Sequence, residues 1–340
     1  MKCATNKQKN TNGNDIVEQV QKLLEERGRK GLELARKEML QEEIECKEIR
    51  EALHYFMTQY WHDTTRPALL SLVCEAVGAD PDITIPIAAG MTLISGATDI
   101  HDDILDLSEI KESRQTVLGK FGKEIALLAG DALLFKGFAL LYKAIEKRVP
   151  VEKMTAIIGV VEKMFFEMGD AEALELQFRG RMDVLPEEYL HVVRKKAADI
   201  EACTRVSAIL GGGSEKEIDA LGKYGRLLGI IAILRDDLTD MIDFEEVLHR
   251  VKRECLPLPI LFALQNPKMK SKLNAVLLKE TMTKKDAETT LKFTHEAGGI
   301  QQFMKVIEKM VVEAHSSLNN ITYNRNYLEM LLEAVILPLS

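Results

Sequence analysis

The sequence predicts an all-α protein, and three observations lead to this fold class. The chain is 46% hydrophobic and rich in Leu, Ala, Glu, Lys and Met, which favour helices over strands. Its apolar residues recur at helical spacing, and no segment shows the apolar-polar alternation of a half-buried strand. Short apolar runs end at Gly or Pro, as helices do. Helices are therefore expected throughout.

The expected elements follow in order. Residues 1–14 lack an apolar run and are expected to be a disordered polar tail, with no signal peptide. Residues 15–58 are expected to form one or two long amphipathic helices. The helix after Arg66 and Pro67 is expected to end at Gly78, because Pro is tolerated in a first turn and Gly favours a helix end. Further helices are expected at about 84–106, 120–146, 151–179, 186–212, 216–241, 257–265, 284–297, 299–319 and 326–337.

Composition limits the class of protein. Nothing between residues 45 and 335 resembles a linker, so residues 15–340 are expected to form a single all-helical domain. A net charge of −8 without a basic stripe gives no footprint for nucleic acid. The five cysteines are scattered and odd in number, which predicts reduced thiols in the cytoplasm. The apolar stretch 83–98 is interrupted by Pro, Gly and hydroxyl residues, so we expect a core helix and no membrane span.

Two acidic runs share the pattern D-D-x-x-D. They consist of Asp102, Asp103 and Asp106, and of Asp236, Asp237 and Asp240. On a helix these spacings place the carboxylates of each run on one face, where neighbours at ~4 Å repel by roughly 4 kcal/mol at an effective dielectric of ~20. Such a face needs counter-charge, and oxygen ligands without a His or Cys cluster indicate Mg²⁺. The two runs together would fit metal ions around a diphosphate.

The alternative interpretation of each acidic run is a solvated helix face, which is the usual meaning of a single charged run. Both runs are entered from apolar residues, however, whereas a solvated helix is amphipathic. Ala97 and Ile100 precede the first run, and Ile230 to Leu234 precede the second. We therefore favour the metal and diphosphate interpretation for both.

With these motifs, the chain resembles the trans-isoprenyl diphosphate synthases over roughly residues 50–320. The resemblance also rests on further short matches, namely Arg66-Pro67, His101, Phe121-Gly122, Leu128 to Leu133, Pro186 to Leu190, Lys195 to Ala198, Leu256-Pro257 and Ala297 to Ile300. It implies the isoprenoid synthase fold, or class I terpenoid synthase fold, in which both aspartate motifs face a central cavity. It also implies a prenyltransferase whose six aspartates hold about three Mg²⁺ ions and draw the diphosphate from an allylic substrate.

The resemblance assigns diphosphate contacts to four basic residues. They are Arg66, Lys111, Lys195 and Arg253. Lys111 stands where the family has the first arginine of an Arg-Arg-Gly motif, so the charge is kept and the bidentate fork is lost. Lys195 matches the lysine of a Lys-Thr-Ala motif; without the resemblance, a solvated helix lysine would be the better interpretation. Arg253 belongs to a shortened counterpart of the family's lysine-rich loop.

The half of the site that receives isopentenyl diphosphate in this family is changed. Asp63 replaces a lysine, Glu112 an arginine, Ser95 a histidine and Ile233 a glutamine, and the segment after Asp240 is shorter than in the family. Two of these changes reverse charge where a second diphosphate is expected. The acceptor therefore stays open. The alternatives are a terpene synthase-like cyclase or hydrolase of the same allylic diphosphate, and a non-catalytic partner subunit, which the intact aspartates disfavour.

Two further expectations follow from the resemblance. Ala97 and Thr98 stand where bulky aromatic residues limit the tail in this family, so a farnesyl or geranylgeranyl tail is expected to fit. Members of the family dimerise through the helices expected here at about 84–106 and 120–146. A homodimer, or a heterodimer with a standard synthase, is therefore expected.

Overall fold

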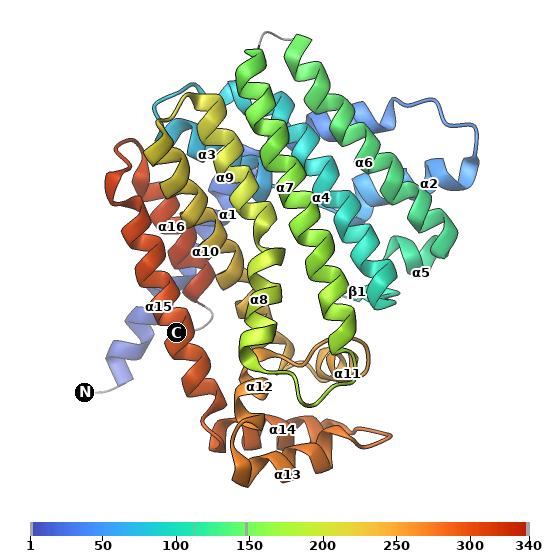
Figure 1. The fold of residues 1–340 in the computed structure, drawn as a ribbon, viewed down its shortest axis with the longest axis vertical. Coiled ribbons are helices and arrows are strands. Elements are labelled where there is room, and N and C mark those ends of the chain that lie inside the picture. The colour runs from blue at the N-terminus through green and yellow to red at the C-terminus, as the bar shows by residue number, and fades with distance from the viewer. Residues whose placement is uncertain (1–2, 112, 147–148, 338–340) are drawn as a thin grey trace. The chain divides into compact units, whose positions relative to one another are not determined.

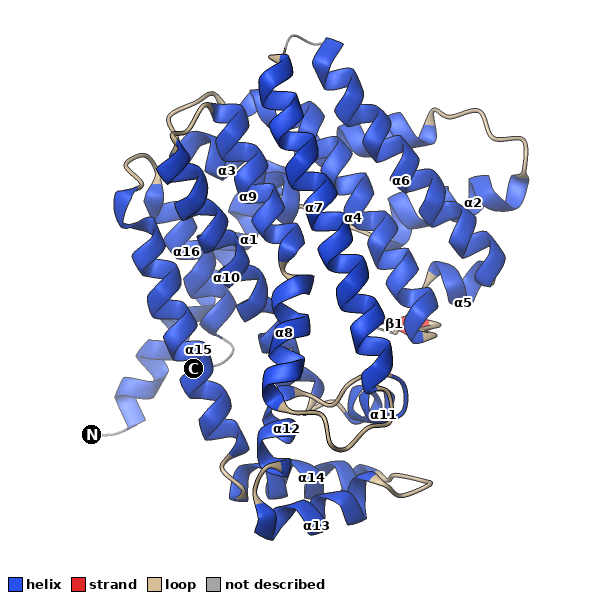
Figure 2. Ribbon diagram, viewed as in Figure 1, coloured by secondary structure: helices blue, strands red, loops and turns tan. Residues whose placement is uncertain are grey.

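The computed structural model describes the backbone of residues 3–111, 113–146 and 149–337, and their side chains except at 3–14, 145 and 146. Helices make up almost all of this backbone, as Figure 2 shows. The strands within the described ranges are β1 (Ile110–Lys111) and β2 (Arg114–Gln115), which form one antiparallel hairpin. The prediction of an all-α fold is confirmed. The chain divides into two compact units, each built from several segments.

The first unit comprises Met1–Glu162, Ala202–Gly222 and Asn320–Ala334. Several helices lie wholly within it. They are α1 (Cys3–Leu40), α2 (Lys47–Tyr55), α3 (Thr65–Ala76), α4 (Ile85–Asp106), α5 (Val117–Phe121) and α6 (Lys123–Glu146). A π-helical turn, Phe56–Tyr60, follows α2, and a 3₁₀ turn, Pro81–Thr84, precedes α4. Most of α16 (Arg325–Ile336) also belongs here.

The second unit comprises Lys163–Glu201, Lys223–Asn319 and Val335–Ser340. The helices wholly within it are α8 (Pro186–Lys196), α11 (Phe244–Arg253), α12 (Leu258–Leu264), α13 (Pro267–Leu277), α14 (Lys284–Glu296) and α15 (Gly299–Ser317), with a 3₁₀ turn at Leu176–Phe178. A further 3₁₀ turn, Leu318–Asn320, ends at the boundary with the first unit. Figure 1 shows α12, α13 and α14 lying together. The boundary between units falls inside α7 (Val151–Glu175), α9 (Ala198–Gly211) and α10 (Glu215–Asp240). The single-domain interpretation of residues 15–340 stays a prediction.

Helix α4 forms the centre of the first unit. It is buried along most of its length, as expected for residues 83–98, and packs against α1, α3 and α6. Its backbone lies close to α6 at Gly90 and Gly137, where a Cβ on Gly137 would lie 2.7 Å from the Ile94 side chain and 2.8 Å from the Gly90 carbonyl oxygen. Glycine at both positions therefore lets the two helices pack closely, and Figure 1 shows α4 and α6 beside each other.

Two helical segments, Pro81–Asp106 and Lys123–Ala144, are long and apolar enough to cross a membrane by length and composition alone. Within the structure, 72% of the first window is buried, which identifies a core helix. The second window is 39% buried and exposes several large apolar side chains, namely Leu127, Leu128, Phe135, Phe138 and Tyr142.

The structure differs from the expected elements in several places. Helix α1 begins at Cys3, so residues 3–14, expected to be a disordered tail, have helical backbone; Lys and Gln there are good helix formers. The expected helix 186–212 is broken at Ala197 into α8 and α9. The sequence did not predict helices α5, α11 and α13. The start of α11 has a local signal, because Asp243 accepts hydrogen bonds from the backbone N–H groups of Glu245 and Glu246.

Candidate active site

The first acidic run lies in the last turn of α4, where the chain reverses direction. Leu107 ends the helix in the left-handed conformation, with a φ of 57°. The β1–β2 hairpin follows and pairs Lys111 with Arg114. This turn brings the Lys111 ammonium group to 2.8 Å from Asp103 Oδ1 and 3.3 Å from Asp102 Oδ2. The short hairpin therefore returns a cation to the carboxylates that precede it, and the predicted residues Asp102, Asp103 and Lys111 lie together.

Two aromatic residues of the same unit fix the hairpin. The Tyr55 hydroxyl donates to the Gln115 carbonyl oxygen at 2.6 Å, and Arg114 donates to the Tyr60 carbonyl oxygen at 3.1 Å. The Arg114 guanidinium also lies 5.4 Å from the centre of the Tyr60 ring. Burial raises the pKa of Tyr60 to about 12, so its hydroxyl stays neutral beside the acidic run. Glu112, the predicted charge reversal, lies outside the described residues.

The electrostatics of the first run are dominated by Asp103. Its side chain is 3% exposed, and burial raises its pKa to about 6 against the pull of Lys111. Burial lowers the pKa of Lys111, but Asp102 and Asp103 outweigh that effect and leave its pKa raised. The run also sits at the C-terminal end of a helix, where the helix dipole is negative. Three carboxylates at such an end favour added positive charge.

The carboxylates of the first run suit Mg²⁺, the ion that the resemblance implies. The donor set fits, because Asp102, Asp103 and Asp106 offer only oxygen atoms, and Lys111 alone does not balance their charge. Within the described residues, however, no three acidic, His or Cys side chains converge on a point that could hold an ion. Binding an ion would therefore require Lys111 to release Asp102 or Asp103.

The second acidic run lies in the last turn of α10, in the second unit. Asp237 is fully buried and each of its oxygens accepts hydrogen bonds. Oδ1 accepts from the Tyr189 hydroxyl at 2.7 Å and from Arg250 Nη2 at 2.6 Å, and Oδ2 accepts from the Leu258 N–H at 3.1 Å. Asp237 therefore anchors α8, α11 and the start of α12 to α10.

Arg250 is the cation of this second cluster. Its guanidinium also lies 3.3 Å from Asp240 Oδ2 and 3.4 Å from Glu254 Oε2, and donates to the Cys255 carbonyl oxygen at 2.9 Å. Burial raises the pKa of Asp237, and raises that of Asp240 to about 6, while Arg250 opposes both shifts. Asp236 differs, because its exposed side chain pairs with Arg235 at 2.7 Å. Arg250 thus forms ion pairs with Asp237 and Asp240, two of the aspartates that the sequence assigned to metal binding.

The remaining predicted diphosphate contacts are held by carboxylates or exposed. Arg66 Nη1 lies 2.8 Å from Asp63 Oδ2, and Lys195 Nζ lies 2.8 Å from Asp170 Oδ2. Arg253 is exposed on α11. The structure thus groups Lys111 with the first run on the first unit, and places Lys195, Arg253 and the second run on the second unit. That the two acidic runs face each other stays a prediction.

Sequence reasoning missed three functional candidates. Tyr189 lies in the matched segment Pro186 to Leu190 and Arg250 lies three residues before Arg253, and neither was assigned a role, although an aromatic hydroxyl and a guanidinium are natural partners for a carboxylate. Asp99 was not singled out. It lies one helical turn before Asp102 on the same face of α4, which is a signal the sequence contains. Its Oδ2 accepts a 2.6 Å hydrogen bond from Trp61 Nε1.

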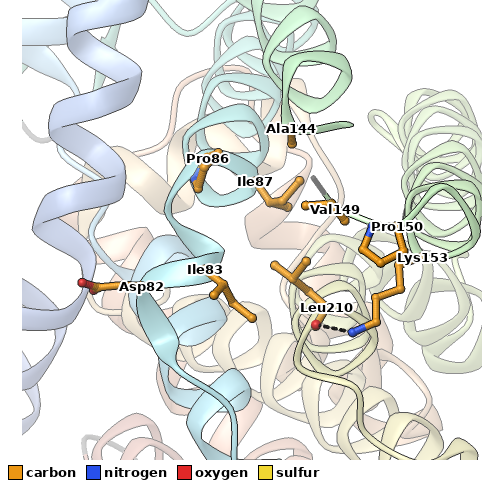
Figure 3. A pocket seen from close by; sticks show the side chains of 9 residues that line it. All are labelled: Asp82, Ile83, Pro86, Ile87, Ala144, Val149, Pro150, Lys153 and Leu210. Atoms are coloured by element: carbon orange, nitrogen blue, oxygen red, sulfur yellow. Dashed lines mark hydrogen bonds between the residues drawn. The ribbon is translucent and has the colours of Figure 1, made fainter. Parts of the chain in front are cut away.

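A cavity of about 360 Å³ borders the opposite end of α4, as Figure 3 shows. Its walls are mainly apolar, formed by Ile83, Pro86, Ile87, Ala144, Val149, Pro150 and Leu210, with Asp82 and Lys153 beside them. The Lys153 ammonium donates to the Leu210 carbonyl oxygen at 2.8 Å. At ~1.5 Å per residue, the helix separates this cavity from the first acidic run by roughly 20 Å.

Comparison with known proteins shows which family the chain resembles. Residues 46–294 match the family model described as polyprenyl synthetase. A short chain isoprenyl diphosphate synthase of Methanothermobacter thermautotrophicus is 39% identical over 186 residues, which cover 54% of this chain and 56% of that protein. A geranylgeranyl diphosphate synthase of Methanosarcina mazei is 38% identical over 188 residues, covering 55% and 57%. The chain thus spans slightly more than half the length of these curated relatives.

Solved structures extend the likeness over nearly the whole chain. The crystal structure of geranylgeranyl pyrophosphate synthetase from Pyrococcus horikoshii superposes with a TM-score of 0.83 at 26% identity, covering 94% of this chain and 98% of that one. That of the archaeon Geoglobus acetivorans gives 0.81 at 25% identity, covering 92% and 99%. The chain belongs to the polyprenyl synthetase family. The predicted family is confirmed.

Proposed function

We propose that this protein is a Mg²⁺-dependent prenyltransferase that ionises an allylic diphosphate with a farnesyl or geranylgeranyl tail. The observation that carries the proposal is the end of α4, a core helix, where Lys111 pairs with Asp102 and Asp103 and Asp106 lies in the same last turn. The names of the relatives, which are prenyl diphosphate synthases, support it. Helix α4 also borders an apolar cavity at its other end. Charge at one end and apolar walls at the other suit an amphiphile with a diphosphate head and a hydrocarbon tail.

The residues of this chain would act as follows. Asp102 and Asp106, which are both half-buried and one turn apart, would hold the metal, and Asp103 would stay closer to Lys111. When bound, Mg²⁺ would supply Lewis-acid stabilisation of the departing diphosphate. The Lys111 ammonium, released from the carboxylates, can then pair with a diphosphate oxygen. The buried apolar residues of α4 would exclude water from the tail.

A second candidate is a terpene synthase-like hydrolase or cyclase of the same allylic diphosphate. The ion pair between Asp63 and Arg66 favours this candidate. Arg66 is the cation of the family's isopentenyl diphosphate motif that this sequence retains, and Asp63 already neutralises its charge. Both candidates release diphosphate, so one assay covers them. A non-catalytic partner subunit would release none.

The test is diphosphate release from geranylgeranyl diphosphate in the presence of Mg²⁺. We expect release by the wild type and a loss of at least about 100-fold in Asp102→Asn, since one lost charge-stabilising group typically costs 10²–10³ in rate. Asp219→Asn is the matched control, because Asp219 is an exposed aspartate of the same unit that pairs with Arg205 at 2.9 Å. Unchanged release by Asp102→Asn, or no release by the wild type, would remove the proposal.

The partner and location belong to the same proposal. The exposed apolar side chains of α6, Phe135 and Tyr142 among them, support a homodimer or a heterodimer with a standard synthase. Sedimentation of a stable monomer at micromolar concentration would contradict this. A cytoplasmic location is supported by the described cysteines, Cys46, Cys74, Cys203 and Cys255, which are all unbridged.

A further inference from the structure

A small polar cluster lies in the first unit on the N-terminal side of the first acidic run. It consists of Trp61, Asp63, Arg66 and Asp99, contributed by the segment before α3, by α3 itself and by α4. Trp61 Nε1 donates to Asp99 Oδ2 at 2.6 Å, and Arg66 Nη1 donates to Asp63 Oδ2 at 2.8 Å. Trp61, Asp63 and Arg66 lie within one short segment of the sequence. Each of the two pairs therefore has at least one member in that segment. The cluster corresponds to the changed, acceptor-binding half of the site.

The charge of Arg66 is used within this cluster. Asp63 is 8% exposed and its Oδ1 also accepts from the backbone N–H groups of Thr65 and Arg66, at 2.8 and 3.3 Å. These bonds cap the first turn of α3 and fix the carboxylate beside the guanidinium. A diphosphate would have to displace a positioned, nearly buried carboxylate from Arg66. The negative charge of the diphosphate would also be repelled by Asp99, and Arg66 is the one cation among the four residues of the cluster.

Asp99, in contrast to the cation Arg66, can accept a hydrogen bond from a ligand. The indole of Trp61 satisfies Oδ2, and no hydrogen bond within the described residues reaches Oδ1. The side chain is half-buried, so Oδ1 is neither solvated as on a surface nor satisfied as in a core. Burial raises the pKa of Asp99 and Arg66 opposes that shift, so a partly desolvated carboxylate here gains from a ligand that brings a proton or a positive charge.

We propose that the acceptor of the prenyl group is a small protic nucleophile, a hydroxyl or amine without a diphosphate, which donates a hydrogen bond to Asp99 Oδ1. This inference rests on the proposed function, because it names the acceptor of the same reaction. The hydroxyl and the amine share the required chemistry, a lone pair for bond formation and a hydrogen for Asp99. Water is the smallest member of the class and would yield the prenyl alcohol.

The transfer balances without a further reactant. The bond between C1 of the allylic chain and the diphosphate oxygen breaks, and its electron pair leaves with the diphosphate. The lone pair of the acceptor oxygen or nitrogen forms the new bond to C1. The proton of the acceptor passes to Asp99 Oδ1. The products are a prenyl ether, alcohol or amine, free diphosphate and one proton, which Asp99 later returns to solvent.

The chain carries its own reporter for this site. Trp61 is its single tryptophan, and its indole N–H is bonded to Asp99, so its fluorescence responds to a ligand at the carboxylate. The experiment titrates the full chain with isopentenyl alcohol, isopentenylamine and isopentenyl diphosphate, each with Mg²⁺. These probes share one carbon skeleton and differ only in the head group. We expect saturable emission changes with the alcohol or the amine at concentrations at least about tenfold below those needed with the diphosphate.

Two variants make the test specific. Asp99→Asn keeps the shape and removes the acceptor charge, so the amine and alcohol should bind roughly ten- to hundredfold more weakly. Asp63→Asn keeps the α3 cap and frees Arg66, so it should strengthen isopentenyl diphosphate binding. Asp219→Asn should behave as the wild type. If Asp99→Asn fails to fold, the gain in Asp63→Asn still decides the question. Tighter binding of isopentenyl diphosphate than of both the alcohol and the amine by the wild type would overturn the inference, as would unchanged probe binding in both Asp99→Asn and Asp63→Asn.

A product assay separates this inference from the proposed function. Geranylgeranyl diphosphate and Mg²⁺ are incubated with each probe, and diphosphate release and prenyl products are measured separately. Release accompanied by prenyl ether, amine or alcohol supports the inference, whereas release accompanied by a longer prenyl diphosphate overturns it and leaves the proposed function standing. No release refutes the proposed function, while selective binding of the protic probes in the fluorescence titration would still support the chemistry assigned to Asp99.

Discussion

The strongest stability prediction concerns Arg250, which pairs with Asp237 and Asp240 of the second acidic run. Arg250→Met removes the guanidinium and keeps an unbranched apolar side chain of comparable length. Asp237, fully buried, would lose its 2.6 Å partner and would keep only the Tyr189 hydroxyl and the Leu258 N–H. Breaking a buried ion pair from one side typically costs 3–5 kcal/mol, because the remaining charge is left uncompensated. We expect a loss of about 3–5 kcal/mol here.

The loss can be measured by thermal unfolding followed by circular dichroism. For domains of about 150–250 residues, each kcal/mol shifts the midpoint by roughly 2–4 °C, so Arg250→Met is expected to unfold roughly 6–20 °C below the wild type. Arg253→Met is the matched control, since Arg253 lies on the same helix and is exposed. Its effect should stay within about 0.5 kcal/mol. A shift of Arg250→Met no larger than that of the control would show that the Arg250 network does not stabilise the fold.

A double variant isolates the ion pair itself. In Arg250→Met with Asp237→Asn, both charges are absent, so the buried carboxylate no longer lacks a partner. We expect this variant to recover part of the stability lost in Arg250→Met alone. Strictly additive losses from the two substitutions would mean that each residue acts through other contacts.

Three further predictions concern packing and acid stability. Gly137→Ala should cost about 1–3 kcal/mol, because the new Cβ would meet Ile94 and the Gly90 carbonyl oxygen; denaturant unfolding measures it, and an unchanged midpoint would refute the close helix contact. Ala97→Phe should cost a similar amount, since Ala97 is fully buried in the packed core cluster with Phe56, and a thermal shift would test this. The hydrogen bond from Lys279 lowers the pKa of Asp286 from 3.8 to about 2. The stabilisation that the Asp286 carboxylate provides is therefore present above about pH 4 and is lost as pH falls toward 2. Asp286→Asn should remove that part of the acid dependence of unfolding, and an unaltered acid profile would contradict this prediction.

Much of the fold was determined by the local sequence. The helices at 84–106 and 120–146 were predicted to within a few residues, because long apolar segments with Pro or Gly near their ends leave little choice of structure. Helix α13 was missed although Asn266 and Pro267 form a recognisable helix start; its apolar periodicity is weak, and packing on α12 and α14 completes it. Residues 3–14 contain no apolar face, so the sequence offered no reason to expect their helical backbone.

The candidate site was likewise predicted in part by local sequence and in part decided by tertiary contacts. Spacing alone identified both acidic runs, since i, i+3 and i+4 positions share a helix face whatever surrounds them. Spacing could not show which cation each run would meet. That depends on a hairpin returning Lys111 to Asp102 and Asp103, and on α11 carrying Arg250 to Asp237.

The sequence by itself therefore determined the helical class and the family, and it predicted which residues bind a diphosphate, because these follow from composition and from motifs of fixed local geometry. Only the tertiary structure decided that Arg66 pairs with Asp63, that Arg250 pairs with the buried Asp237, and that no hydrogen bond from a described residue reaches Asp99 Oδ1. The physical reason is that burial and pairing depend on side chains brought together from different elements. The energy of a charge is set by those neighbours and not by its position in the chain.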